Sequence, residues 1–119
     1  MRVLIADDHE LVRKGLGAIF SGEPGWTVCG EAANGQEAVD LVAKLHPDLV
    51  LLDITMPEKD GLQALKEILA ADPGARVIMC SALGQESKVL ESIKSGAKDF
   101  VVKPFQPDRV LEAIGKALA

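Results

Sequence analysis

Three aspartates, a serine and a lysine stand directly after separate apolar runs of this sequence. Asp7 and Asp8 follow the first run, Asp53 the third, Ser81 the fourth and Lys103 the fifth. An ionised aspartate beside a divalent cation can attack phosphorus and form an acyl phosphate, without help from a general base. An ammonium and a hydroxyl can stabilise the oxygens of the transferring group. These residue types therefore predict phosphoryl transfer to Asp53, assisted by Lys103 and Ser81.

The same aspartates predict a cation site. Carboxylates that lie close together repel one another, and a divalent cation removes that repulsion. Oxygen ligands without a nearby cluster of His or Cys favour Mg²⁺ over zinc. Asp8 and Asp53 are expected to be direct ligands, with the backbone carbonyl of Thr55 completing the protein's share. Asp7 is expected to act through a metal-bound water, and His9 to face solvent at the start of a helix.

Such a site needs a sheet that brings the ends of the apolar runs to one edge. Five apolar runs alternate with five segments of helical period, which predicts an α/β fold with a parallel sheet and helices on both faces. In such sheets, ligands bind beyond the carboxyl ends of the strands. The predicted strands are Arg2–Ala6, Thr27–Ala32, Asp48–Leu52, Arg76–Cys80 and Asp99–Val102.

Capping patterns mark the starts of the helices between these strands. Asn34 is followed three residues later by Glu37, and Asp60 by Gln63, and both pairs are typical of capping boxes. Pro107 falls where the first turn of the fifth helix is expected, a position that suits proline.

The composition limits the classes of function. The 119 residues fit a single domain, residues 1–119, and a net charge of −5 argues against direct binding of nucleic acid. No stretch approaches the ~20 apolar residues that span a membrane, and the N-terminus is unlike a signal peptide. We therefore expect a cytoplasmic protein without membrane insertion. Cys29 and Cys80 are expected to be small buried hydrophobic residues.

Three segments of the sequence carry a family resemblance: Val3–Asp8, Asp48–Pro57 with Asp60 and Gly61, and Gly96–Phe105. Through them, and over essentially its whole length, the chain resembles response-regulator receiver domains. The resemblance implies a flavodoxin-like (βα)₅ three-layer sandwich with a parallel sheet of order 2-1-3-4-5. It also implies that a sensor histidine kinase phosphorylates Asp53, and that the Lys103–Pro104 peptide bond is cis.

The resemblance also implies a switch. Ser81 lies where the family carries its hydroxyl residue, and Phe100 where it carries its switch aromatic. Phosphorylation is expected to draw Ser81 inward and to admit Phe100 into the vacated space. The face formed by the fourth helix, fifth strand and fifth helix would then change its affinity for a downstream protein partner. Simple packing is the alternative role for Phe100, and both a monomer and a phosphorylation-dependent dimer remain open.

Other interpretations concern origin and activity. The segment Val3–Ile19 looks like receivers of helix-turn-helix regulators, whereas Val77–Ala117 looks like stand-alone chemotaxis regulators of the CheY type. One alternative function is a small phosphatase with an Asp nucleophile. Such enzymes carry a second Asp two residues after the nucleophile, where this chain has Thr55. The other alternative is an engineered or reconstructed scaffold of the same fold without a signalling role.

Overall fold

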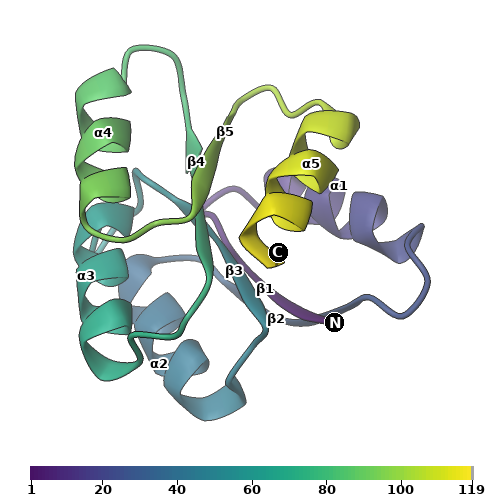
Figure 1. The fold of residues 1–119 in the computed structure, drawn as a ribbon, viewed down its shortest axis with the longest axis horizontal. Helices are drawn as coiled ribbons and strands as arrows, with labels where there is room; N and C mark the ends of the chain where they lie inside the picture. The colour runs from purple at the N-terminus through teal and green to yellow at the C-terminus, as the bar shows by residue number, and fades with distance from the viewer. Residues whose placement is uncertain (119) are drawn as a thin grey trace.

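The computed structural model describes residues 1–118, which form a central sheet between two layers of helices (Figure 1). Strands and helices alternate strictly along the chain, as the sequence predicts, and the last helix begins at Pro107. The elements are β1 (Arg2–Ala6), α1 (Glu10–Ser21), β2 (Thr27–Ala32), α2 (Gly35–Leu45), β3 (Leu49–Asp53), α3 (Gly61–Ala71), β4 (Val77–Ser81), α4 (Glu86–Lys94), β5 (Asp99–Val102) and α5 (Pro107–Leu118).

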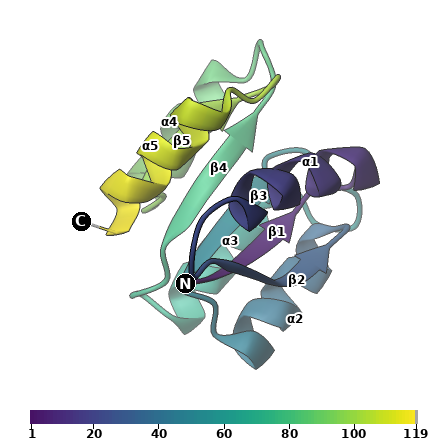
Figure 2. The ribbon, with the colours of Figure 1, turned by 90° about the vertical axis from the view of Figure 1, so that its right-hand side faces the viewer.

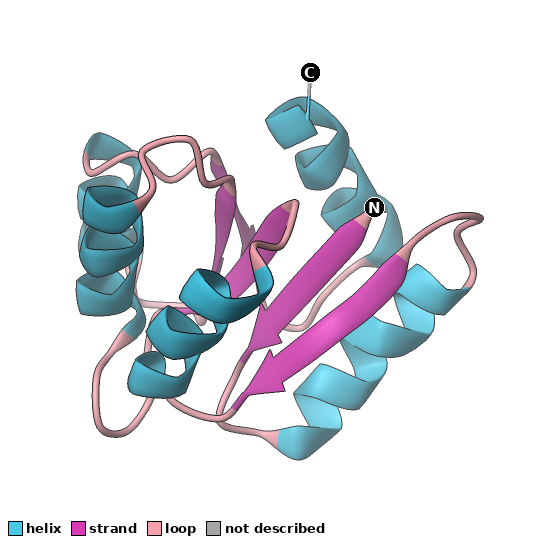
Figure 3. Ribbon diagram, turned by 90° about the horizontal axis from the view of Figure 1, so that it is seen from below, coloured by secondary structure: helices cyan, strands magenta, loops and turns pink. Residues whose placement is uncertain are grey.

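All neighbouring strands are parallel, and their order is β2-β1-β3-β4-β5 (Figure 3). The predicted flavodoxin-like sandwich and its strand order 2-1-3-4-5 are therefore confirmed. The helices α1 and α5 cover the face of the sheet that is turned to the viewer in Figure 2, and α2, α3 and α4 cover the other. This arrangement leaves the carboxyl edge of the sheet free of helices, so that the loops there can carry a site.

Buried apolar side chains divide between the two faces of the sheet. In β1, Leu4 and Ala6 pack on the α2 and α3 side, whereas Val3 and Ile5 pack on the α1 and α5 side. Every residue of β3 is buried. The consecutive apolar residues of this segment thus fill both halves of the core, as expected for a central parallel strand.

Two strands, β3 and β4, are shifted by one residue at both ends relative to the prediction. We predicted Asp48–Leu52 and Arg76–Cys80, whereas β3 ends at Asp53 and β4 at Ser81. The apolar runs stop one residue earlier than the sheet, because Asp53 still pairs with Cys80, and Ser81 with Val102. The backbones of Asp53 and Ser81 are therefore held in the sheet.

The predicted capping boxes form in part. The backbone N–H of Glu37 donates to Oδ1 of Asn34 at 2.8 Å, and the Glu37 side chain accepts a bond from the N–H of Ala33 at 2.8 Å. The N–H of Gln63 donates to Oδ1 of Asp60 at 2.8 Å, but the Gln63 side chain bonds along the helix instead. Asp60 therefore caps α3 by its own side chain.

Two expectations from the composition can be compared with the structure. Cys80 is buried, whereas Cys29 is only partly buried, and both are free thiols. Between residues 1 and 118, no helix combines the length and the apolar character that crossing a membrane requires.

Gly61 fixes the loop that leaves β3. Its N–H donates to the carbonyl of Ile54 at 2.7 Å, and a Cβ at Gly61 would overlap the carbonyl oxygen of Asp53. The start of α3 therefore lies directly against the backbone of the predicted acceptor residue.

Gly61→Ala is expected to lower the free energy of unfolding by about 2 kcal/mol or more, because the new methyl group meets rigid backbone. Gly17→Ala is the control, since a Cβ there has no atom within 4 Å. That change should be neutral or stabilise α1 by up to ~1 kcal/mol. Urea denaturation measures both, and equal effects of the two substitutions would contradict the close approach.

Candidate functional site

The structure brings the five predicted residues to the carboxyl edge of the sheet. Asp7 and Asp8 follow β1, Asp53 is the last residue of β3, Ser81 is the last residue of β4, and Lys103 follows β5. Because β1 lies beside β3, and β4 lies between β3 and β5, these strand ends are neighbours. The side chains therefore reach one region from four strands.

Lys103 connects two of the acids. Its Nζ lies 2.8 Å from Oδ2 of Asp7 and 3.2 Å from Oδ2 of Asp53. Both aspartates are buried, with 1% and 4% of their surface exposed. The Lys103 backbone is anchored by its N–H, which donates to the carbonyl of Ser81 at 2.8 Å. The Lys103–Pro104 peptide bond is cis, as the family resemblance implies.

Asp7 carries one oxygen with spare capacity to accept a hydrogen bond. Its Oδ1 accepts the backbone N–H of His9 at 2.9 Å, and its carbonyl accepts a bond from Arg13 at 2.7 Å. Its Oδ2 pairs with the Lys103 ammonium at 2.8 Å and has no further partner among residues 1–118. A buried carboxylate oxygen in this state is suited to a cation or to a water bound by one.

The charges around Asp53 do not balance. Burial and then the negative charge of Asp7 raise the pKa of Asp53 from 3.8 to about 6, although Lys103 opposes the shift. Burial would lower the pKa of Lys103, but its attraction to Asp7 and Asp53 is stronger, and the pKa is raised. One ammonium thus serves two buried carboxylates, which leaves an excess of negative charge for a further cation to neutralise.

The side chains near Asp8 suit a hard divalent cation. Carboxylate oxygens of Asp7 and Asp8 lie within 4.8 Å of each other and of a nitrogen of His9. The His9 side chain is 70% exposed, which agrees with the solvent-facing position expected for it. Among the described residues, Asp53 does not join this group at that distance.

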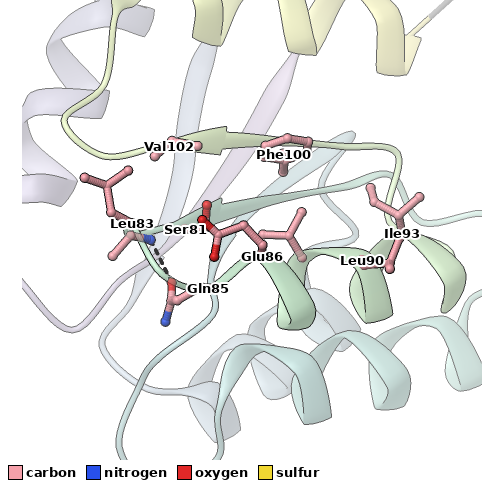
Figure 4. A pocket seen from close by; sticks show the side chains of 10 residues that line it. Ser81, Leu83, Gln85, Glu86, Leu90, Ile93, Phe100 and Val102 are labelled. Atoms are coloured by element: carbon pink, nitrogen blue, oxygen red, sulfur yellow. Dashed lines mark hydrogen bonds between the residues drawn. The ribbon is translucent and has the colours of Figure 1, made fainter.

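Ser81 and Phe100 lie on neighbouring strands beside a groove. Ser81 is buried, and its hydroxyl points to the carbonyl of Val101 at 3.5 Å, the long limit of a hydrogen bond. Phe100 is half-buried. Both residues line a groove of about 410 Å³ between α4 and β5 (Figure 4). Most of the other lining residues are apolar, namely Ala82, Leu83, Val89, Leu90, Ile93 and Val102; the remaining two are Gln85 and Glu86.

Sequence reasoning missed Gln85, which joins two loops at this edge. Its Oε1 accepts the backbone N–H of Ala82 at 2.7 Å, and its Nε2 donates to the hydroxyl of Thr55 at 2.7 Å. The only signal for Gln85 in the sequence is its residue type at this position. Gln85 occupies the N-cap position of α4, where Ser, Thr, Asp or Asn is usual, and its side chain does not cap the helix.

Comparisons with known proteins agree on one family. The family described as "Response regulator receiver domain" matches residues 3–115. Chemotaxis protein CheY of Thermotoga maritima is 55% identical, over 97% of this chain and 95% of the relative. CheY of Bacillus subtilis is also 55% identical, over 98% of this chain and 97% of the relative. The similarity to CheY thus includes the N-terminal segment that we likened to receivers of helix-turn-helix regulators.

A solved structure is similar over the whole chain. It is the complex of CheX and CheY with BeF₃ and Mg²⁺ from Borrelia burgdorferi. This chain is 41% identical to it, with a TM-score of 0.95 over 100% of this chain and 90% of that one.

The raised pKa of Asp53 predicts a pH-dependent cost to folding. Since the pKa of Asp53 is about 6 in the folded state and has its ordinary value of 3.8 in the unfolded chain, ionisation of Asp53 disfavours the fold. The cost is small at pH 4 and complete above the folded pKa. Without metal, Asp53→Asn should therefore raise the free energy of unfolding by about 1 to 3 kcal/mol at pH 8 and by little at pH 4.

Urea denaturation in a chelator at both pH values measures this difference. Asp40→Asn, a change on the exposed side of α2, is the control and should show no pH-dependent gain. Equal effects of Asp53→Asn at the two pH values would contradict the raised pKa.

Proposed function

The chain belongs to the response regulator receiver domain family and is a phosphorylatable two-component signalling domain of the CheY type; we propose that Asp53 is its phosphoacceptor. A receiver of this type is a signalling protein and not a conventional enzyme. The observation that carries the proposal is the contact of Lys103 with Asp7 and Asp53, which is made at the carboxyl edge of the sheet.

The proposed reaction needs few protein groups. The Asp53 carboxylate attacks the phosphorus of a phosphohistidine, and the bond from phosphorus to the histidine nitrogen breaks. Lys103 neutralises charge on the phosphoryl oxygens, and Ser81 donates a hydrogen bond to one of them. Mg²⁺, when bound, shields charge on the carboxylates and the phosphoryl group. We assign its binding to Asp8, Asp53, the Thr55 carbonyl and, through water, Asp7.

The two alternative functions have less support. A conventional phosphatase needs an acid two residues after the nucleophile, but the Thr55 hydroxyl there accepts a hydrogen bond from Gln85. Two buried aspartates that share one lysine leave unbalanced negative charge, which disfavours folding and is not expected in an inert scaffold. The similarity to CheY proteins over nearly the full chain also favours signalling.

We assign two protein partners to the domain. A sensor histidine kinase supplies the phosphoryl group in the cytoplasm, and a downstream protein binds the α4-β5-α5 face. Exposed apolar side chains on that face support the second assignment, since Leu90 is 57%, Ile93 39% and Val102 38% exposed. The similar CheY from Borrelia burgdorferi was crystallised with a protein, CheX. The net charge of −5 favours protein partners over nucleic acid.

The proposed switch connects Asp53 to that face. The weak bond of Ser81 to Val101 can be replaced by a stronger bond to a charged phosphoryl oxygen. Movement of the Ser81 side chain would make room for half-buried Phe100, which already borders the groove. Since Phe100 has no hydroxyl, its position depends on packing alone.

Incubation with acetyl phosphate and Mg²⁺, followed by intact mass spectrometry, tests the acceptor. The wild-type chain should gain one phosphoryl group, and so should Asp40→Asn, because Asp40 lies away from the site on α2. Asp53→Asn should gain none, because the attacking carboxylate is lost. Modification of Asp53→Asn to the wild-type level, or none of the wild-type protein at high donor concentration, would refute the assignment.

A further inference from the structure

We propose that Gln85 is a positioning residue that restrains phosphorylation: it occupies the Ala82 N–H, and a phosphoryl group on Asp53 must displace it. This inference rests on the proposed function. It goes beyond that function because it names the group that competes with the phosphoryl oxygens for the Ala82 N–H, namely the Gln85 side-chain oxygen.

The Gln85 side chain is bonded at both ends. Its Oε1 accepts the Ala82 N–H, and its Nε2 donates to the Thr55 hydroxyl, each at 2.7 Å. Thr55 lies two residues after Asp53, and Ala82 lies one residue after Ser81. Figure 4 shows the Gln85 oxygen directed at the backbone beside Ser81. One amide therefore ties the loop after the acceptor to the loop after the hydroxyl residue.

The Ala82 N–H is well placed to bind an anion. The pairing of Asp53 with Cys80, and the bond from the Ile54 N–H to the Cys80 carbonyl at 3.0 Å, hold the ends of β3 and β4 side by side. Free N–H groups in turns at such an edge form anion-binding concavities. In the described structure, the Ala82 N–H donates to Gln85 instead. A charged phosphoryl oxygen is the stronger acceptor and would win this competition.

The residue type at this position agrees with such a role. The Gln85 side chain turns back over the loop and leaves the first turn of α4 without a side-chain cap. Gly84 has a φ of +88°, a conformation that glycine adopts without strain, and it reverses the chain so that Gln85 can reach Ala82. A Ser or Asp at this position would cap α4, but it would be too short to reach Thr55.

Release of Gln85 would also loosen α4. This helix has nine residues, and only Ser92 is fully buried. Gln85 lines the α4–β5 groove together with Ser81 and Phe100. Displacement of its side chain would therefore free the loop before α4 at the same moment as Ser81 moves.

The test is the affinity for BeF₃⁻ in the presence of Mg²⁺, followed by NMR. Gln85→Ala should bind BeF₃⁻ roughly 2- to 10-fold more tightly than the wild type, since one or two neutral hydrogen bonds no longer compete. Gln85→Glu should bind it more weakly, because a carboxylate holds the Ala82 N–H more strongly and repels the anion. Gln63→Ala, at an exposed position of α3, is the matched control and should equal the wild type.

Hydrogen exchange of the Ala82 amide gives an independent readout. In the metal-free protein, this amide should exchange faster in Gln85→Ala than in the wild type. If Gln85→Ala proves unfolded by thermal melting, Thr55→Val removes the bond at the other end and should also tighten BeF₃⁻ binding, by a smaller factor.

The outcomes separate this inference from the proposed function. A wild-type protein that binds no BeF₃⁻ would refute both. If the wild type binds it but Gln85→Ala binds it equally or more weakly, only the role of Gln85 is refuted. Weaker binding by both Gln85 variants would assign Gln85 a structural role instead.

Discussion

One lysine ammonium between two buried carboxylates is the interaction on which the site depends. Lys103 lies 2.8 Å from Asp7 and 3.2 Å from Asp53, and Asp8 adds a third acid nearby. Lys103 does not fully neutralise the negative charge of these aspartates, as the raised pKa of Asp53 indicates. An added cation stabilises buried carboxylates that repel one another in this way. A phosphoacceptor that depends on Mg²⁺ needs such an affinity for cations.

Much of this arrangement could be predicted from the sequence. The strict alternation of apolar runs and helical periods indicated the parallel sheet, and the polar residues after the runs indicated its functional edge. The strand order came from the family resemblance, and the structure agrees with it. The ends of β3 and β4 were wrong by one residue, because pairing between strands continues past the last apolar side chain to Asp53 and Ser81.

The remaining features depend on contacts between distant segments, which no local pattern records. Lys103 was expected to serve the phosphoryl group, but its approach to Asp7 follows from the adjacency of β1 and β3 in the sheet. Gln85 was missed because a glutamine in a loop is usually solvated. Its partners, Thr55 and Ala82, become neighbours only once β3 and β4 pair. Short-range sequence patterns thus predicted the elements and the reacting groups, whereas the restraints between loops required the fold.

The affinity for Mg²⁺ of Lys103→Ala tests the central claim most directly. If Lys103 only neutralises an over-charged cluster of acids, its removal leaves more negative charge, and Mg²⁺ should bind equally or more tightly by isothermal titration calorimetry. Lys98→Ala, an exposed position at the opposite edge of the sheet, should bind Mg²⁺ like the wild type. Weaker Mg²⁺ binding by Lys103→Ala than by both other proteins would contradict the account.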